Sequence, residues 1–389
     1  MDGLTTENKP QYSVFAKVAV IVLAMLLFFF ALDMVVSALS QTVGYINDNL
    51  LSTALNPFIG LFIGLLVTAL IQSSSTTSTM IVAMVATGAL SIEEAVPVIM
   101  GANCGTTLTS TLVALGFISK KRAFRKALEV GIIHDFYNII LVLVLFPLEY
   151  YYKFLSGLAT YLSQFLFGDQ LENIIAPGKS VIGTGLTDKI FLWVGNGPLV
   201  LVLSFVLLFI SIKFLAATIH RTVIGESKAK LRKFVFDKPV KSFSWGLLVT
   251  AAVQSSSVTT SILVPLAATD KIRLKNAFNF IIGANLGTTI TAIIAAGFSS
   301  QAAATIAIAH LLFNIAGAVI FMALPGLRRL LVDFVKKFSY AVTRSRLIGL
   351  AYIVIIFFLL PFLLISFNNK KSEVDFEADN QRVEDVIDR

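Results

Sequence analysis

Long apolar stretches separated by short polar connections occupy most of the chain. They cover approximately residues 14–39, 57–90, 95–118, 128–148, 196–219, 243–268, 277–298, 305–325 and 347–367. Several of them reach the ~20 residues that an α-helix needs to cross the hydrocarbon core of a bilayer. The pattern predicts an all-α polytopic membrane protein that is embedded in the lipid bilayer.

Composition and the placement of charge agree with this interpretation. The 389 residues are 56% hydrophobic and only 14% charged, far less charge than a soluble domain carries. Basic residues gather in three connections, at 119–126, 228–241 and 328–346. Such clusters between apolar segments mark the cytoplasmic side of membrane proteins. The placement of the basic residues therefore explains the net charge of +8 by the orientation of the protein in the membrane. No nucleic-acid partner is expected.

Two copies of one unit are visible in the sequence. The string GLLVTALIQSSSTTS begins at Gly64, and GLLVTAAVQSSSVTT begins at Gly246. The offset of 182 residues holds without a gap to the strings GANCGTTLT and GANLGTTIT. The correspondence resumes with HDFYN at His134 and HLLFN at His310. Because polar strings survive in both copies while apolar positions drift, we interpret them as a duplicated site rather than as duplicated packing.

The charges that flank the two copies predict that they cross the membrane in opposite directions. The first copy follows residues 40–56, which lack Lys and Arg, whereas the second follows the basic stretch 228–241. The basic loop 119–126 inside the first copy corresponds to the uncharged 297–304 in the second. Opposite flanking charge on homologous units is typical of inverted-topology repeats, whose substrate binds near the midplane between them.

These features divide the chain into seven segments. We predict a cytoplasmic N-terminus (1–13), a first transport repeat with its preceding helix (14–148), an external connection (149–195), a second inverted repeat with its preceding helix (196–325), a basic amphipathic segment (326–346), a final transmembrane helix (347–367) and an acidic disordered tail (368–389).

The QSSS strings carry the first candidate chemistry. A polar run halfway along an apolar segment is costly in lipid unless it lines a cavity or a helix break. Residues 57–90 are also too long for one upright crossing, which favours a re-entrant or broken helix in each copy. Helix breaks offer free N–H groups that suit an anion. We predict that the substrate is bound by Gln72, Ser73, Ser74, Ser75, Gln254, Ser255, Ser256 and Ser257.

The GAN-x-GTT strings and their neighbours supply neutral oxygen atoms. Amide and hydroxyl oxygens suit a hard monovalent cation, whereas a transition metal prefers imidazole or thiolate. An oxyanion in these strings meets no Lys or Arg, so bound sodium ions would have to balance its charge. We predict co-transported sodium at Asn103, Thr106, Thr107, Thr77, Asn285, Thr288, Thr289, Asn138 and Asn314.

Physical reasoning alone reaches a cation-coupled anion transporter and leaves phosphate, sulfate and dicarboxylates open. An intramembrane serine hydrolase is the alternative from another class, because Ser, His and Asp all occur at membrane depth. The duplicated serines and the lack of a Gly-x-Ser-x-Gly elbow argue against it, so we expect no enzyme.

Taken together, the strings resemble those of the type II sodium–phosphate cotransporter family. The resemblance covers roughly residues 14–367 and rests on FFFALDMVVSAL, on the paired QSSS strings and on HDFYNIILVLVLFPLE and HLLFNIAG. It implies sodium-driven phosphate symport across a cell (inner) membrane by a homodimer whose subunits transport independently. The short, cysteine-free 149–195 implies a bacterial-type member.

Asp135 is the one acidic residue in the apolar segment 128–148 apart from Glu129 at its start. An ionisable residue at membrane depth is a functional candidate by default. The second copy has Leu311 at this position, so a shared structural need does not explain the aspartate. The resemblance implies that an aspartate after this histidine binds an additional sodium ion and makes transport electrogenic.

Overall fold

The computed structural model describes residues 14–46, 56–167, 189–190, 193–194, 197–223, 235–297, 300–363 and 366. Within these ranges every regular element is helical, which confirms the all-α class. Five of the described helices are long and apolar enough to cross a membrane, namely Ile92–Leu115, Lys121–Tyr152, Leu274–Ala296, Gln301–Ala323 and Arg346–Leu363. The predicted cytoplasmic N-terminus (1–13) and acidic tail (368–389) lie outside the described residues.

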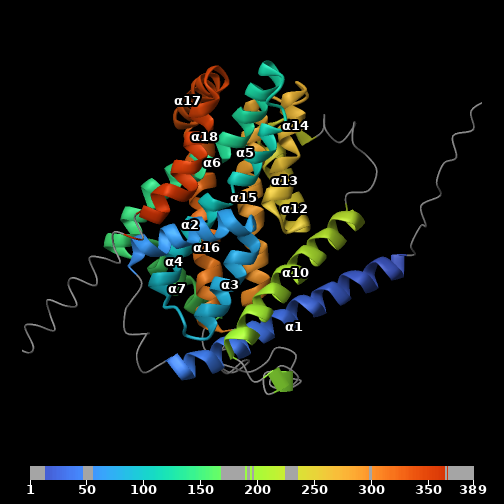
Figure 1. Ribbon diagram of the computed structural model, residues 1–389, viewed down its shortest axis with the longest axis vertical. Helices are drawn as coiled ribbons and strands as arrows, with labels where there is room; N and C mark the ends of the chain where they lie inside the picture. Colours follow the sequence, from blue (N-terminus) through green and yellow to red (C-terminus); the bar gives the residue numbers. More distant parts are fainter. Residues whose placement is uncertain are drawn as a thin grey trace, which may run out of the picture.

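The helices follow the order of the predicted segments (Figure 1). The first copy and its flanks comprise α1 (Val14–Ile46), α2 (Pro57–Ile71), α3 (Ser74–Ala86), α4 (Ile92–Gly105), α5 (Leu108–Leu115), α6 (Lys121–Tyr152) and α7 (Phe154–Phe167). The second comprises α10 (Gly197–Val223), α12 (Pro239–Val253), α13 (Ser256–Ser261), α14 (Leu263–Ala268), α15 (Leu274–Ala296) and α16 (Gln301–Ala323). The chain continues through α17 (Pro325–Arg344) and α18 (Arg346–Val354) into a π-helical turn (Ile355–Leu359).

Two boundaries differ from the sequence expectation. The apolar stretch 95–118 forms two helices, α4 and α5, which separate at Thr106 and Thr107. The matching stretch of the second copy runs unbroken through α15. The connection 149–195 also begins as helix, because α6 extends to Tyr152 and α7 follows after Lys153 takes a left-handed conformation.

Glycines bring α2 against α4, and α12 against α15, at backbone contact. A Cβ atom on Gly101 would lie 1.8 Å from the carbonyl oxygen of Leu61, and one on Gly283 would lie 1.9 Å from that of Phe243. Gly64 meets the carbonyl of Val98 in the same way. Only glycine permits such close approach. The 182-residue offset found in the sequence therefore also holds for the contacts.

Short helices of each copy pack against helices of the other copy, and we call these helices the arm of each copy (α3 in the first, α13 and α14 in the second). In the first copy, α3 packs against α15 and α16, whereas in the second copy α13 and α14 pack against α5 and α6. Figure 1 shows α3 towards the end of the bundle where α7 lies, and α14 towards the end where α5 and α17 lie. Equivalent helices of the two copies therefore pack against each other's neighbours.

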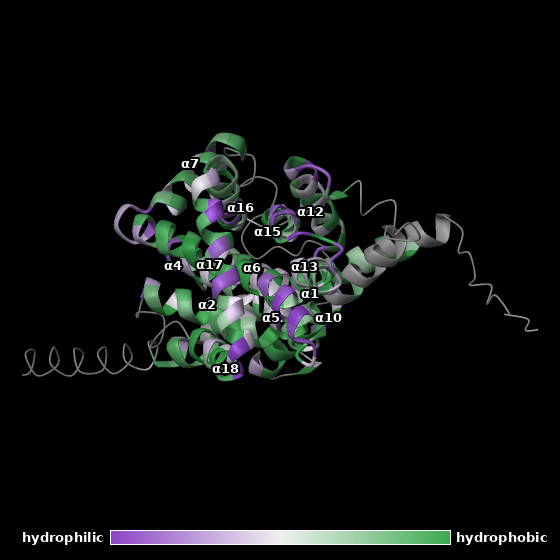
Figure 2. Ribbon diagram, turned by 90° about the horizontal axis from the view of Figure 1, so that it is seen from above, coloured by the Kyte–Doolittle hydropathy of each residue, from purple (hydrophilic) through white to green (hydrophobic). Residues whose placement is uncertain are grey.

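The basic segment predicted at 326–346 forms an amphipathic helix. In α17 the apolar side chains of Leu331, Val332 and Val335 are buried. Four of its five basic residues are exposed, and Arg328 is partly buried and donates to Asn279. Figure 2 shows its hydrophilic stretches among helices that are mainly hydrophobic. A helix with one charged and one apolar face is typical of a position at a membrane surface.

Candidate functional site

A break in the helix occurs at the same glutamine of both copies. Gln72 (φ 56°) and Gln254 (φ 54°) adopt the left-handed conformation and end α2 and α12, with their N–H groups bonded to Thr68 and Thr250. The next residues, Ser73 and Ser255, are extended and cap α3 and α13. Each break leaves the first N–H groups of a new helix without helical partners, which suits an anion. The helix breaks expected from the polar runs are therefore present.

The two breaks meet across the copies. The hydroxyl of Ser75 donates a hydrogen bond to the backbone carbonyl of Gln254 over 2.8 Å. Nearby, the hydroxyls of Ser110 and Thr260 lie 2.9 Å apart. The two predicted substrate strings, 182 residues apart, thus form one region. Their glutamines differ, because Gln72 is exposed whereas Gln254 is buried.

The remaining serines of the two strings lie at the starts of α3 and α13. Ser74, Ser256 and Ser257 are all buried. Ser73 and Ser255 are partly exposed, and each accepts a hydrogen bond from the backbone N–H three residues later, over 3.3 Å. Hydroxyl groups at this density offer several donors and acceptors within one short turn of helix.

A buried network of asparagines and histidines also joins the two copies. His134 Nε2 lies 2.6 Å from Asn285 Oδ1, and Asn285 donates to Asn138 Oδ1 over 2.7 Å. On the other side, His310 Nε2 lies 3.4 Å from Asn103 Oδ1. Each histidine therefore contacts the asparagine of the opposite copy. The duplicated sequence folds so that equivalent residues exchange partners.

Asn103 lies at the centre of this network. Asn138 donates to its backbone carbonyl over 2.9 Å, and Asn314 lies 3.4 Å from its side-chain oxygen. Asn103, Asn138 and Asn314 are all buried. Sequence analysis selected the asparagines but not the histidines, although HDFYN and HLLFN carried the signal. Buried polar groups in such a network specify how the two copies join.

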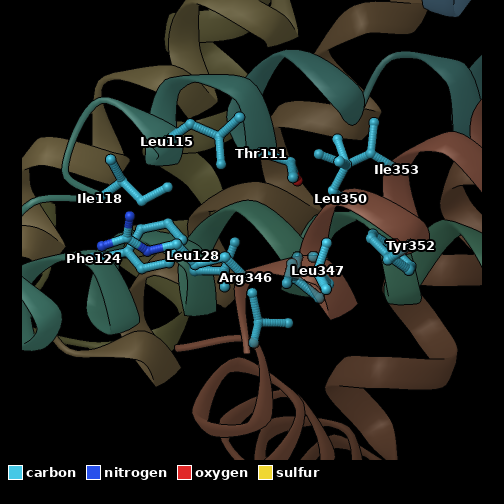
Figure 3. Close-up of a pocket in the computed structure, with 13 residues that line it drawn as sticks. Thr111, Leu115, Ile118, Phe124, Leu128, Arg346, Leu347, Leu350, Tyr352 and Ile353 are labelled. Carbon is cyan, nitrogen blue, oxygen red and sulfur yellow. The ribbon is translucent and has the colours of Figure 1, made fainter. Parts of the chain in front are cut away.

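Asp135 lies apart from this network and is fully buried. Its Oδ2 atom accepts hydrogen bonds from Thr111 (3.0 Å) and Tyr352 (2.9 Å). Its Oδ1 atom has no hydrogen-bond partner among the described residues. Figure 3 shows Thr111 and Tyr352 on the wall of a neighbouring cavity. Sequence reasoning missed both residues, and Tyr352 belongs to α18, outside the repeats.

The predicted threonines bond mainly within their own helices. Thr106 and Thr288 donate to the carbonyls of Ala102 and Ala284, four residues earlier. Thr107, Thr289 and Thr77 likewise donate to nearby carbonyls of Cys104, Leu286 and Ser73. A hydroxyl that donates its proton keeps its lone pairs, so these oxygens can still accept a cation. The described contacts do not join them to the asparagine network.

The serines lack the partner that a nucleophile needs. The hydroxyl of Ser75 donates to a backbone carbonyl, and both histidines contact asparagines through Nε2. Among the described residues, neither His134 nor His310 is hydrogen-bonded to a serine hydroxyl of either string. A serine hydrolase requires that contact.

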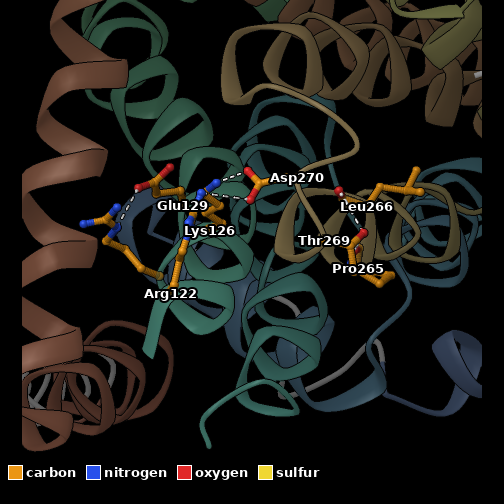
Figure 4. Close-up of polar contacts among 8 residues, drawn as sticks. Arg122, Lys126, Glu129, Pro265, Leu266, Thr269 and Asp270 are labelled. Carbon is orange, nitrogen blue, oxygen red and sulfur yellow. Dashed lines mark hydrogen bonds and ion pairs between the residues drawn. The ribbon is translucent and has the colours of Figure 1, made fainter. Parts of the chain in front are cut away.

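Ion pairs connect the basic loop of the first copy with the second copy (Figure 4). Arg122 Nη2 lies 3.4 Å from Asp270 Oδ2, and Lys126 also pairs with Asp270. Asp270 has a left-handed backbone (φ 60°), and the equivalent position of the first copy is Gly88 (φ 76°). The turn after α14 therefore lies beside the basic start of α6, because the residues predicted as a loop at 119–126 are helical from Lys121 on.

Comparisons with known proteins agree with this description. Residues 27–171 and 207–338 match the sequence model described as Na+/Pi-cotransporter. The chain is 27% identical to "Sodium-dependent phosphate transport protein 2B" of Homo sapiens, over 88% of this chain and 64% of the relative. It is 30% identical to "Sodium-dependent phosphate transport protein 2A" of Rattus norvegicus, over 87% of this chain and 65% of the relative. No solved structure gave a significant match.

Proposed function

Because this chain belongs to the Na+/Pi-cotransporter family, we propose that it is a transporter, not an enzyme, and imports inorganic phosphate by sodium symport. The chain spans 64% of the length of the human relative, whose name describes sodium-dependent phosphate transport. The observation that carries the proposal is the meeting of two broken helices at the Ser75–Gln254 hydrogen bond. Such a meeting point of two repeats is where transporters of this architecture bind substrate.

Phosphate fits the chemistry of the two breaks. The first N–H groups of α3 and α13 and the hydroxyls of both QSSS strings are donors suited to tetrahedral oxygens. We assign this role to Gln72, Ser73, Ser74, Ser75, Gln254, Ser255, Ser256 and Ser257. The strings contain no Lys or Arg, so a buried anion there requires accompanying cations. This requirement is the physical origin of the coupling.

Sodium fits the oxygen atoms around the breaks. We propose that the Oδ1 atom of Asp135, which has no hydrogen-bond partner among the described residues, binds one sodium ion. Its negative charge has no counterpart at Leu311, so the ion would be additional to those held by neutral oxygens. Three sodium ions with a divalent phosphate move one net positive charge inward, which makes transport electrogenic. The neutral candidates are Asn103, Asn138, Asn285, Asn314, Thr77, Thr106, Thr107, Thr288 and Thr289.

We further propose inverted repeats, an inner-membrane location and a homodimer with independent subunits. The inversion is supported by the ion pairs of Asp270, which join the turn after α14 to the basic loop 119–126. Position 88 of the first copy, equivalent to Asp270, follows α3, which Figure 1 shows towards the opposite end.

Uptake of labelled phosphate into sealed vesicles tests the proposed function. With sodium outside we expect rapid uptake, and with choline in its place we expect uptake near background. Excess unlabelled phosphate should abolish uptake of the label, whereas sulfate and dicarboxylates should leave it unchanged. Equal uptake in choline contradicts the coupling, and inhibition by sulfate or dicarboxylates favours another oxyanion as substrate.

Variants of the two glutamines test whether both copies contribute. Gln72→Gly and Gln254→Gly remove the amide while keeping a residue suited to the left-handed backbone. We expect each to abolish uptake with normal amounts of protein in the membrane. Gln72→Asn and Gln254→Asn keep an amide and tolerate this backbone, so they serve as matched controls and should retain activity. Full uptake by either glycine variant removes that glutamine from the site.

A further inference from the structure

A cavity of about 300 Å³ lies between α5, α6, the end of α17 and α18. Its wall is built almost entirely of hydrocarbon, from residues such as Leu115, Leu128, Ile132 and Ile353. This volume is near the lower limit of the range for small-ligand sites and too small for a helix of a partner protein. None of the residues to which substrate or sodium binding is assigned above lines it.

One charged residue, Arg346, lines the otherwise apolar cavity. Arg346 is exposed and forms no ion pair with any described residue. Figure 3 shows its guanidinium group at the end where Ile118 and Phe124 lie, with Tyr352 at the opposite end. The cavity therefore has a cationic end and an apolar body.

The cavity lies beside a helix with the length and composition of a membrane span. Arg346 begins the candidate membrane span Arg346–Leu363, of which only 17% is buried. Leu347 and Leu350, which line the cavity, are 75% and 61% exposed. Arg346 follows the basic amphipathic helix α17, so the cationic end lies at the level of that helix. A ligand can thus enter from the bilayer without crossing water.

We propose that this cavity binds an anionic phospholipid, with one acyl chain among the apolar residues and the phosphate group at Arg346. The hydrocarbon wall excludes free inorganic phosphate, whose desolvation it cannot compensate. A zwitterionic lipid has the same chains but carries a choline cation beside its phosphate. Charge complementarity with Arg346 therefore selects the anionic lipid.

The site has a direct connection to Asp135. Thr111 and Tyr352 line the cavity, and both donate hydrogen bonds to Asp135 Oδ2. An acyl chain packed against α18 holds Tyr352 in the position in which it reaches the carboxylate. Anionic lipid should therefore favour cation binding at Asp135. This consequence rests on the proposed function, whereas the binding itself does not.

Photolabelling of the full-length protein tests the binding. The purified chain in nanodiscs is irradiated with phosphatidylglycerol that carries a diazirine near the end of one acyl chain, and adducts are located by mass spectrometry. We expect adducts on α5, α6 and α18, competed by unlabelled phosphatidylglycerol more strongly than by phosphatidylcholine. Arg346→Gln should lower this labelling about fivefold, the effect of one basic residue at a membrane surface.

Lys337→Gln is the matched control, because it removes the same charge from an exposed residue of α17 that does not line the cavity. It should leave the labelling unchanged. Leu128→Trp fills the cavity and should remove the adducts while Arg346 remains. Three results would overturn the proposal. They are adducts found only outside α5, α6 and α18, equal competition by the two lipids, and an equal loss of labelling in Lys337→Gln and Arg346→Gln. None of these readouts depends on phosphate transport.

Discussion

At the scale of single residues, the two copies differ most clearly in charge at Asp135, where the second copy has Leu311. Asp135 is fully buried, two hydroxyls donate to one of its oxygens, and the other has no partner among the described residues. A buried carboxylate with an unsatisfied oxygen is costly unless a cation or a proton joins it. The second copy avoids this cost with Leu311. The position therefore has the properties of a cation ligand that only one copy provides.

This reasoning predicts that Asp135 confers voltage dependence. In vesicles with an imposed potassium–valinomycin potential, wild-type uptake should rise as the inside becomes negative, because one net charge gains ~2.3 kcal/mol per 100 mV. Asp135→Gly should keep uptake sodium-dependent but insensitive to the potential. Asp135→Asn, which preserves the shape of the side chain, should behave in the same way.

Two outcomes contradict this prediction. If wild-type uptake ignores the potential, transport is electroneutral and the proposed third sodium ion is absent. If Asp135→Asn retains the full voltage response while Asp135→Gly loses stability, the carboxylate serves to pack α6 and does not bind the ion.

Sequence alone identified Asp135 but not its donors. A lone acid in an apolar stretch is visible locally, whereas the hydrogen bond from Tyr352 joins residues 217 positions apart. Tyr352 also lies in a helix without a counterpart in either copy, so the repeat gave no signal there. The glutamine breaks were predictable because a polar run in lipid must interrupt a helix or line a cavity.

At the scale of elements, the glycine contacts make the helix pairs α2–α4 and α12–α15 intolerant of substitution. Gly101→Ala would place a Cβ atom 1.8 Å from the backbone oxygen of Leu61, so whole helices must separate. We expect a loss of at least about 1–3 kcal/mol, the usual cost of overpacking. The measurement is thermal unfolding of the purified protein in detergent, where the midpoint should fall.

Gly157→Ala is the matched control for this experiment. Gly157 lies in α7, and a Cβ atom there would meet nothing within 4 Å. This change should leave the midpoint unchanged or raise it, because alanine favours helix over glycine. Equal effects of the two substitutions would contradict the importance of the close contact.

Helix boundaries were less predictable than helix positions. The same Gly-Thr-Thr triplet accompanies a break between α4 and α5 in the first copy and a continuous α15 in the second. The triplet itself cannot produce this difference, so the residues that follow it and their contacts must. In the first copy Thr111 is bonded to Asp135, whereas the equivalent position 293 is an isoleucine that faces no such acid.

At the scale of the whole molecule, inversion predicts opposite exposure of equivalent residues. Thr87 and Thr269 are separated by the 182-residue offset, and each bonds the carbonyl four residues earlier at the end of its arm. On a Cys104→Ser background, Thr87→Cys should react with an impermeant thiol reagent from outside. Thr269→Cys should react only after the membrane is opened, because its neighbour Asp270 pairs with the basic loop.

Ala123→Cys provides the control for this experiment, since Ala123 lies among the basic residues at the start of α6 and should be protected together with Thr269→Cys. Labelling of Thr87→Cys and Thr269→Cys from the same side would show that the copies are parallel. The ion pairs of Asp270 would then have to form on the outer surface.

The glycine contacts have a mechanical consequence. Helices whose backbones touch cannot slide past each other, so α2–α4 and α12–α15 each behave as one stiff body. The copies meet instead through hydroxyl and amide hydrogen bonds such as Ser75–Gln254 and His134–Asn285, each worth about 0.5–1.5 kcal/mol and able to exchange partners. Deformation concentrates at the weakest joint, and here that joint contains the proposed binding groups. If one body rocks against the other during transport, these hydrogen bonds must break and form again in every transport cycle.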